Sequence, residues 1–302
     1  MKSSSASAAG APSRALSGFR LVFDLFKLRI GVAIGATAFA GMAIAPGPID
    51  PLTGLAVVLA VTLASAAAGA FNQYVERDID REMKRTRNRA FVTGRLAAGP
   101  RWPLTIAAVA AGGVALAWVA ANPLAAFYTA AGAFTYGVVY TVWLKRRTAW
   151  NIVIGGLAGS FAVLAGAAAV GGGALDPATI AFAVVLFLWT PPHFWSLAIA
   201  FRDDYAAARV PMLPVVVGDQ KAARAVFWGA AMLVASSIVP AFLGLSWAYL
   251  AAAVGGGALL LWRTAQLAAD PSRARALASF HASLIQLSLL IVAAMIEPLL
   301  RA

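Results

Sequence analysis

The chain has 302 residues, of which 61% are hydrophobic and only 12% are charged, whereas soluble domains have about 25% charged residues. Its 24 Lys and Arg against 12 Asp and Glu give a net charge of +12, and it contains no cysteine. This composition excludes an ordinary soluble domain, disulfides and thiolate metal sites. Apolar runs long enough to cross a bilayer recur along the whole chain. The sequence therefore predicts an all-α, polytopic integral membrane protein, a bundle of about nine transmembrane helices.

The N-terminal stretch MKSSSASAAGAPSRALSGFR is small, polar and weakly basic, without the continuous apolar region of a signal peptide. We expect residues 1–18 to form a flexible cytoplasmic tail and residues 19–302 to form one transmembrane domain. Apolar residues then recur at helical spacing, which is typical of a short amphipathic helix on the membrane surface. They are Phe19, Leu21, Val22, Leu25 and Phe26.

Nine apolar segments follow, separated by Pro- and Gly-rich breaks. We expect them at 28–46, 52–74, 101–121, 124–144, 150–170, 177–201, 222–244, 246–263 and 277–297. With nine spans, one side of the membrane receives all 24 Lys and Arg residues except Arg301. The positive-inside rule makes that side cytoplasmic, so the C-terminus is expected on the periplasmic side of a bacterial inner membrane. The basic residues then face lipid headgroups or an anionic ligand, and they do not indicate nucleic acid.

The second expected span ends in NQYVERDIDREMKRTRNR, residues 72–89, which holds charges of both signs. Asn72, Glu76 and Asp80 are four residues apart, and each such step on an α-helix turns only about 40° and rises about 6 Å. They form one stripe of oxygen ligands, whereas Asp78 lies about 200° from Glu76. Because Mg²⁺ takes one or two carboxylates together with substrate phosphates, we predict that the stripe holds Mg²⁺.

Basic side chains surround this stripe and are expected to bind a diphosphate. They are Lys84, Arg85 and Arg89 beside it, and Lys145 and Arg146 at the end of the fourth span. An equally good explanation from charge alone is a helix that ends in water, with a salt-bridged cytoplasmic loop. Asn72 favours the site, because polar residues inside an apolar run usually face a cavity or a partner.

A second group of candidates lies in the sixth span and the connection after it. Arg202, Asp203, Asp204 and Tyr205 occupy the connection, and helix capping would also explain them. His193 follows two prolines in TPPHFW and is either a packed interior residue or an acceptor contact. Asn151, one turn into the fifth span, is a candidate for a buried polar contact. His281 remains open between packing and acceptor contact.

The pattern N-x-x-x-D/E-x-x-x-D at the end of the second span resembles the UbiA superfamily of intramembrane prenyltransferases. Three further segments are similar to one branch of it, the protohaem IX farnesyltransferases or haem O synthases. They are YTVWLKRRTAWNIVIGG (140–156), WTPPHFWSLAIAFRDDYAAARVPMLPVV (189–216) and FHASL (280–284). The resemblance extends over essentially the whole chain after residue 20, and TPPHFW with DDY…PMLPV narrows it to the haem branch.

This resemblance implies a reaction in which the farnesyl group of farnesyl diphosphate is transferred to a vinyl group of haem b, giving haem O. It implies Mg²⁺ as the cofactor, held by Asn72, Glu76 and Asp80. Many superfamily members have a second D-x-x-x-D, but here Ala207 and Ala208 take the later positions. The chain therefore lacks the complete second motif, and Asp203 and Asp204 are left as candidate ligands of a second metal. A haem A synthase or an oxidase assembly factor is an expected partner.

Three other functions compete with this one. A secondary transporter usually has ionisable groups near the bilayer midplane, and this chain has them at one rim. A prenyltransferase that uses a quinone-ring precursor is the nearer alternative, and the haem-branch segments favour haem b. A non-catalytic assembly factor for a terminal oxidase would not need the Asn72–Glu76–Asp80 stripe.

Overall fold

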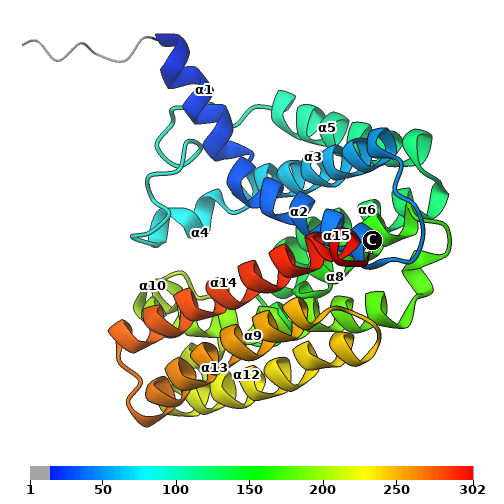
Figure 1. The fold of residues 1–302 in the computed structure, drawn as a ribbon. Helices are drawn as coiled ribbons and strands as arrows, with labels where there is room; N and C mark the ends of the chain where they lie inside the picture. Colours follow the sequence, from blue (N-terminus) through cyan, green and yellow to red (C-terminus); the bar gives the residue numbers. More distant parts are fainter. Residues whose placement is uncertain (1–13, 302) are drawn as a thin grey trace, which may run out of the picture.

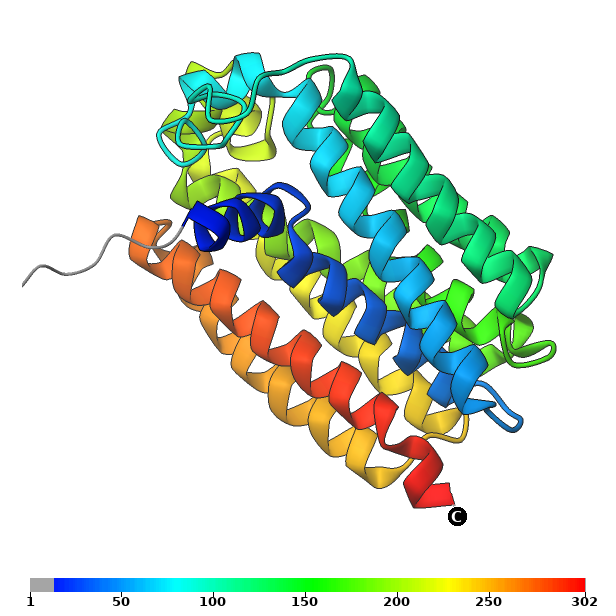
Figure 2. The same ribbon diagram turned by 90° about the horizontal axis from the view of Figure 1, so that it is seen from above.

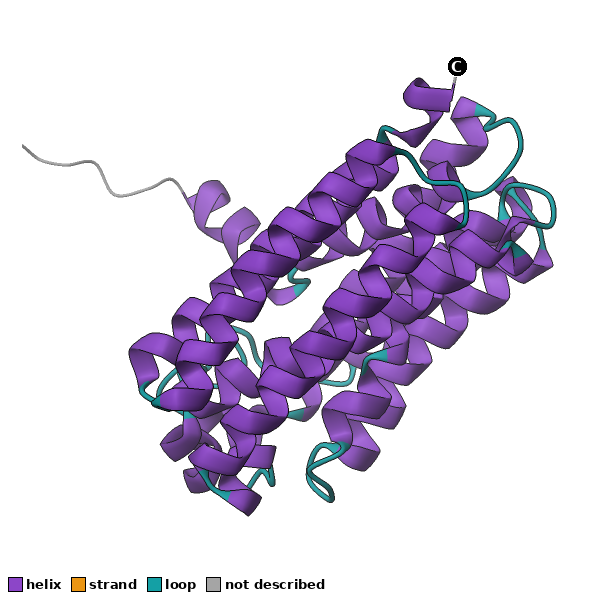
Figure 3. Ribbon diagram, turned by 60° about the horizontal axis from the view of Figure 1, so that its bottom comes forward, coloured by secondary structure: helices purple, strands orange, loops and turns teal. Residues whose placement is uncertain are grey.

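The computed structural model describes residues 14–301, and no strand is present among them (Figure 3). Most of the expected N-terminal tail, residues 1–13, lies outside this range. Residues 14–18, which we expected in the tail, form the start of the first helix. The amphipathic helix predicted around Leu21 is present and begins earlier than expected, at Arg14.

The elements in chain order are as follows (Figure 1). They are α1 (Arg14–Leu25), α2 (Leu28–Ile44), α3 (Pro51–Val75), α4 (Arg77–Glu82), α5 (Arg101–Ala120), α6 (Pro123–Phe134), η1 (Thr135–Leu144), α7 (Asn151–Gly155), α8 (Leu157–Ala168), η2 (Gly173–Leu175), α9 (Pro177–Ala200), α10 (Arg202–Ala207), α11 (Leu213–Val217), α12 (Asp219–Phe242), α13 (Trp247–Ala269), α14 (Arg273–Met295) and α15 (Glu297–Arg301).

The expected spans are present with small changes at their ends. Seven segments within residues 14–301 are long and apolar enough to cross a membrane: α3, α5, α7 with α8, α9, α12, α13 and α14. The 17-residue α2 and the continuous α6–η1 segment occupy the other two expected positions. The eighth span runs on to Ala269, six residues past the expected end at residue 263, and Arg263 within it lies over the Trp262 ring at 4.1 Å. The chain is an integral membrane protein.

The spans form a closed bundle. Each span packs against the next in chain order, from α2 and α3 through α5, α6, α8, α9, α12 and α13, and α14 returns to pack against α2. Large apolar side chains such as Val119 and Trp118 lie exposed on the outside of the bundle, as expected for a surface that faces lipid.

The connections that contain the candidate residues gather at one end of the bundle. Figure 2 shows α4 and the chain after it at the same end as α10 and α11, with α1 nearby and the C-terminus at the opposite end. This arrangement agrees with the expected placement of the charged connections on one side of the membrane. The two longest of these connections, which contain most of the candidate residues, therefore lie at the same end of the bundle.

Glycines let α2 and α8 approach each other closely. A Cβ built on Gly166 would lie against the carbonyl oxygen of Ala38, and one built on Gly41 would lie against that of Val163. A Cβ built on Gly156, just before α8, would lie 3.0 Å from the Thr190 Cβ of α9. Both regions therefore pack closely, and the tightest contacts are those of α2 with α8.

Replacing Gly166 by alanine is expected to destabilise the bundle. The added methyl group overlaps backbone that cannot rotate away, and overpacking of this kind costs about 1–3 kcal/mol or more. Gly112→Ala is the matched control, because a Cβ there meets nothing within 4 Å. Thermal unfolding in detergent should show a clear loss for Gly166→Ala and none for Gly112→Ala. Equal unfolding temperatures would contradict the packing.

Candidate active site

The three residues of the predicted stripe stay on one face although the helix is interrupted between α3 and α4. The residue between α3 and α4 is Glu76, yet its N–H donates to the Asn72 carbonyl at 3.0 Å and its own carbonyl accepts from the Asp80 N–H at 2.8 Å. These bonds keep the four-residue spacing of an α-helix, so Asn72, Glu76 and Asp80 stay on one face. All three side chains are buried. Their alignment is confirmed, and their role as metal ligands stays a prediction.

Each residue of the stripe has one cationic partner. Lys27 donates to Asn72 Oδ1 at 2.8 Å. Lys145 donates to both oxygens of Glu76 at 2.6 and 2.7 Å, and Arg89 donates to Asp80 Oδ2 at 2.5 Å. Burial raises the pKa of Asp80, and the positive charge of Arg89 opposes that shift. The structure thus places Lys145 and Arg89 where the sequence predicted them, next to the stripe.

A π-helix at the end of the fourth span positions part of this site. Within η1, Thr141 Oγ1 donates to the Tyr136 carbonyl and the Lys145 N–H donates to the Tyr140 carbonyl, both five residues back. Such wide turns are rare in proteins, and those that occur often lie at functional sites. Thr141 Oγ1 in turn accepts from Asn72 Nδ2 at 3.1 Å. The η1 segment therefore binds the stripe through both Thr141 and Lys145.

Three residues that contact the stripe or its partners were not predicted from the sequence. Lys27 lies at the start of α2, Thr141 inside an apolar span, and Tyr136 accepts a 3.2 Å hydrogen bond from Lys27. A polar residue within an apolar run is a recognisable signal for Thr141. Lys27 resembled an ordinary membrane-anchoring lysine, so the sequence held no signal that separated it from its neighbours.

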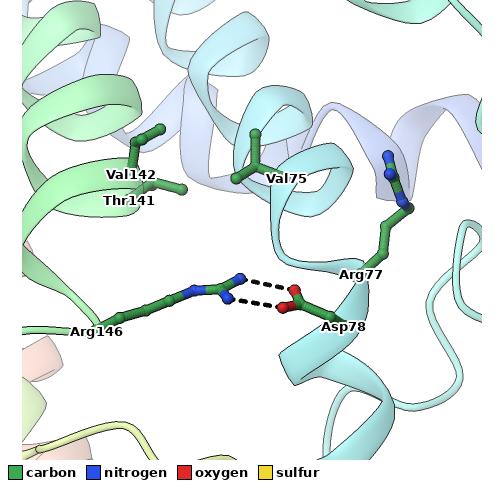
Figure 4. Close-up of a pocket in the computed structure, with 6 residues that line it drawn as sticks. All are labelled: Val75, Arg77, Asp78, Thr141, Val142 and Arg146. Carbon is green, nitrogen blue, oxygen red and sulfur yellow. Dashed lines mark hydrogen bonds and ion pairs between the residues drawn. The ribbon is translucent and has the colours of Figure 1, made fainter.

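Asp78 lies away from the stripe, as predicted. Its side chain is 61% exposed, against 2% for Asp80. Arg146 reaches across to it and forms two hydrogen bonds of 2.7 Å, beside a cavity of about 430 Å³ (Figure 4). These hydrogen bonds hold the pKa of Asp78 below its usual range. Arg146 is therefore engaged on the opposite face from the stripe, whereas its neighbour Lys145 faces inward.

A second cavity, of about 560 Å³, adjoins the stripe. Lys27 and Arg89 line it, together with Arg85. Arg20 and Arg95 add two further positive charges, and Asp24 is the acidic residue in its wall. Lys84 is exposed and is not among the residues that line this cavity. A pocket with this charge suits an anion of several negative charges.

Arg85 connects the stripe region to the second group of candidates. Its backbone N–H donates to Asp204 Oδ2 at 3.2 Å, and its guanidinium donates to the Tyr205 hydroxyl at 3.5 Å. Ile79 and Met83 pack in one apolar cluster with Tyr205. Asp204 and Tyr205 are thus brought to the site.

The other two residues of that group lie apart from it. Asp203 is exposed, and Arg202 pairs with Asp219 at 3.5 Å. Within residues 14–301, neither residue forms a hydrogen bond or an ion pair with the stripe.

The donor set of the stripe fits Mg²⁺ only when other oxygens complete it. Within residues 14–301 no three His, Cys, Asp or Glu side chains lie together as a metal site. Asn72, Glu76 and Asp80 offer one amide and two carboxylate groups. Mg²⁺ is commonly bound by one or two carboxylates, with water and substrate phosphates as the remaining ligands. The stripe fits that pattern.

His193 is held inside the bundle by aromatic rings. It stacks between Trp189 and Phe280, with ring centroids at 4.1 and 4.4 Å. Its Nδ1 lies 2.7 Å from Ser283 Oγ. The described residues include no hydrogen-bond partner for Nε2. His281 is exposed on the same helix as Ser283.

Asn151 is fully buried and only partly satisfied. Its Nδ2 donates to the Thr148 carbonyl at 2.5 Å, while its Oδ1 has no hydrogen-bond partner. Buried amide oxygens are normally paired, so this atom is a candidate for contact with a ligand or water.

A family model for the UbiA prenyltransferase family matches residues 34–290. The chain belongs to the UbiA prenyltransferase family. It is 56% identical to "Protoheme IX farnesyltransferase 2" of Paramagnetospirillum magneticum over 94% of this chain and 99% of the relative. It is also 43% identical to "Protoheme IX farnesyltransferase" of Gloeobacter violaceus, over 90% of this chain and 89% of the relative.

Solved structures support the UbiA fold. A digeranylgeranylglyceryl phosphate synthase superposes with a TM-score of 0.75 at 17% identity, covering 93% of this chain and 98% of that one. A UbiA homologue from Archaeoglobus fulgidus bound to DMAPP and Mg²⁺ has a TM-score of 0.67 at 16% identity, covering 89% and 98%. At these identities the likeness of this UbiA-family chain to them concerns the fold alone.

Proposed function

We propose that this chain transfers the farnesyl group of farnesyl diphosphate to a vinyl group of haem b, giving haem O. The observation that supports this most directly is the buried Asn72–Glu76–Asp80 stripe, which lies beside a basic cavity at the mouth of an apolar bundle. The name shared by the similar UbiA-family relatives indicates the donor and the acceptor. The amide and carboxylate oxygens of the stripe are suited to bind the diphosphate of the donor through Mg²⁺.

In the proposed reaction the carbon–oxygen bond to the diphosphate breaks and a vinyl carbon of haem b bonds to the farnesyl C1. Water then adds to the other vinyl carbon with loss of a proton. Mg²⁺, when bound, neutralises the diphosphate and stabilises it as a leaving group. Asn72, Glu76 and Asp80 would hold the metal. The apolar interior excludes water from the farnesyl carbon until the new bond forms.

Basic residues bind the diphosphate oxygens in this scheme. Arg85 and Arg89 line the cavity beside the stripe. Lys145, at the end of η1, is hydrogen-bonded to Glu76 of the stripe. Lys84 and Arg146 lie further from the stripe in this structure and contribute positive charge at the same mouth. Guanidinium groups suit this task because their paired N–H groups match two phosphate oxygens.

His193 is proposed to contact the acceptor, through the haem iron or a propionate, and the partly satisfied Asn151 is a second candidate for this. His193→Ala should weaken haem b binding, while farnesyl diphosphate binding persists, because only the acceptor side loses a polar contact. Spectroscopic titration of haem b and isothermal titration of the diphosphate measure the two affinities separately. Unchanged haem affinity and turnover would make His193 a packing residue.

The proposed function is tested by a competition between acceptors. Membranes that contain the chain receive radiolabelled farnesyl diphosphate with equal amounts of haem b and a quinone-ring precursor, 4-hydroxybenzoate. Label should enter haem b alone. Label in the aromatic acid would favour the quinone branch, and uptake of label without transfer would favour a transporter.

The N-terminus is proposed to lie in the cytoplasm of a bacterial cell and the C-terminus in the periplasm. Reporter fusions at Ala302 should then be active only as periplasmic reporters, and insertions near Arg85 only as cytoplasmic ones. A cytoplasmic C-terminus would contradict both the number of spans and the placement of the basic connections.

A further inference from the structure

The two carboxylates of the stripe are paired with bases from different parts of the chain. Lys145 comes from the end of η1, and Arg89 from the connection after α4. The Lys145 ammonium lies 2.6 and 2.7 Å from the two oxygens of Glu76. It therefore occupies the position between both oxygens that a cation held by this carboxylate would take.

These pairs are buried enough that neither partner is stable alone. The side chains of Glu76 and Asp80 are 1% and 2% exposed, and that of Lys145 is 11% exposed. A buried ion requires a counter-charge, and breaking such a pair by removing one partner is strongly unfavourable. The carboxylates thus need a replacement cation before they release the bases, and the bases need a replacement anion.

A divalent metal and a diphosphate meet these two needs only together. The two pairs are neutral, so a metal alone adds two positive charges and leaves Lys145 and Arg89 without anions. A diphosphate alone brings further negative charge beside Glu76 and Asp80. The stripe also supplies few ligands of its own, so phosphate oxygens are needed to complete the coordination of Mg²⁺.

We infer that Lys145 and Arg89 are exchangeable counter-ions, which pass from Glu76 and Asp80 to the diphosphate oxygens, so that metal and diphosphate bind cooperatively. This inference rests on the proposed function. The long, flexible side chain of Lys145 suits such a movement. The exposed Asp78–Arg146 pair on the opposite face takes no part in it.

Binding of Mn²⁺, followed by electron paramagnetic resonance, tests this in the purified full chain in lipid nanodiscs. Mn²⁺ is titrated alone and together with inorganic diphosphate. Lys145→Met keeps the unbranched side chain as far as Cε and removes the ammonium group with its charge. Arg147→Met is the matched control, because Arg147 is exposed at the end of the same segment.

Lys145→Met should change the two affinities in opposite directions. Affinity for Mn²⁺ alone should rise about tenfold, because the competing ammonium is gone, and affinity for the Mn²⁺–diphosphate complex should fall by a similar factor. Arg147→Met should change neither by more than about twofold. A purely structural role for Lys145 would lower both affinities together, and that result would overturn the inference.

Wild-type protein that binds Mn²⁺ equally tightly with and without inorganic diphosphate would also overturn it. Failure of the proposed function is a different result, namely no farnesyl transfer to haem b by the wild-type chain. The direction of the two Mn²⁺ affinity changes still decides the inference in that case.

Discussion

Asp80→Asn should slow haem O formation about a hundredfold or more. The substitution keeps the shape of the side chain and removes one negative charge from the stripe. Stabilisation of a leaving group by a metal is worth several kcal/mol, and each 1.36 kcal/mol changes a rate about tenfold. The measurement is the initial rate of haem O formation across a Mg²⁺ titration, corrected for the amount of folded protein.

Asp78→Asn is the matched control for this prediction. It makes the same chemical change two residues earlier, on the side chain that is 61% exposed and paired with Arg146. Its effect should be distinctly smaller, since its carboxylate lies on the opposite face from the stripe. Equal losses in the two variants, or full activity in EDTA, would show that the stripe is a solvated helix end.

Asn72→Ala is the second substitution with a large expected effect, again about a hundredfold in rate. The Asn72 amide accepts a hydrogen bond from Lys27 and donates one to Thr141, so its loss removes a proposed metal ligand and leaves the buried Thr141 and the half-buried Lys27 without this partner. We expect both turnover and the dependence on Mg²⁺ to change. The measurement is the same rate assay, with thermal unfolding recorded in parallel.

Asn122→Ala provides the control. Asn122 lies between α5 and α6, at the end of the bundle opposite the stripe. Asn122 also makes two hydrogen bonds, to the Ala168 carbonyl and from the Ala125 N–H. Its loss should lower the unfolding temperature and leave the rate per folded molecule unchanged. If the two variants lost activity in proportion to stability alone, Asn72 would be a structural residue.

The order and approximate bounds of the apolar helices were predictable because they depend on apolar length. The stripe was predictable for a similar reason, since a spacing of four residues fixes one helix face even through the break at Glu76. The expected end of the eighth span at residue 263 differs from the structure, in which α13 continues to Ala269. Arg263 lies along the helix over Trp262.

The contacts around the stripe were not predictable in the same way. Lys27, Tyr136 and Thr141 reach Asn72 or one another from spans far apart in sequence, and no spacing rule relates them. The π-helix in η1 also changes which side chains face inward. Lys145 points to Glu76 and its neighbour Arg146 to Asp78, a division that follows from the packing of η1 against α3.

The measurement that tests the proposed function most directly is the mass of the haem extracted from membranes that contain this chain. The membranes are supplied with haem b, farnesyl diphosphate and Mg²⁺. We expect haem O, with a hydroxyethylfarnesyl group in place of one vinyl group, and almost none with Asp80→Asn at equal protein levels. Recovery of haem b alone, from wild-type protein shown to be folded and to have Mg²⁺ available, would contradict the proposed function.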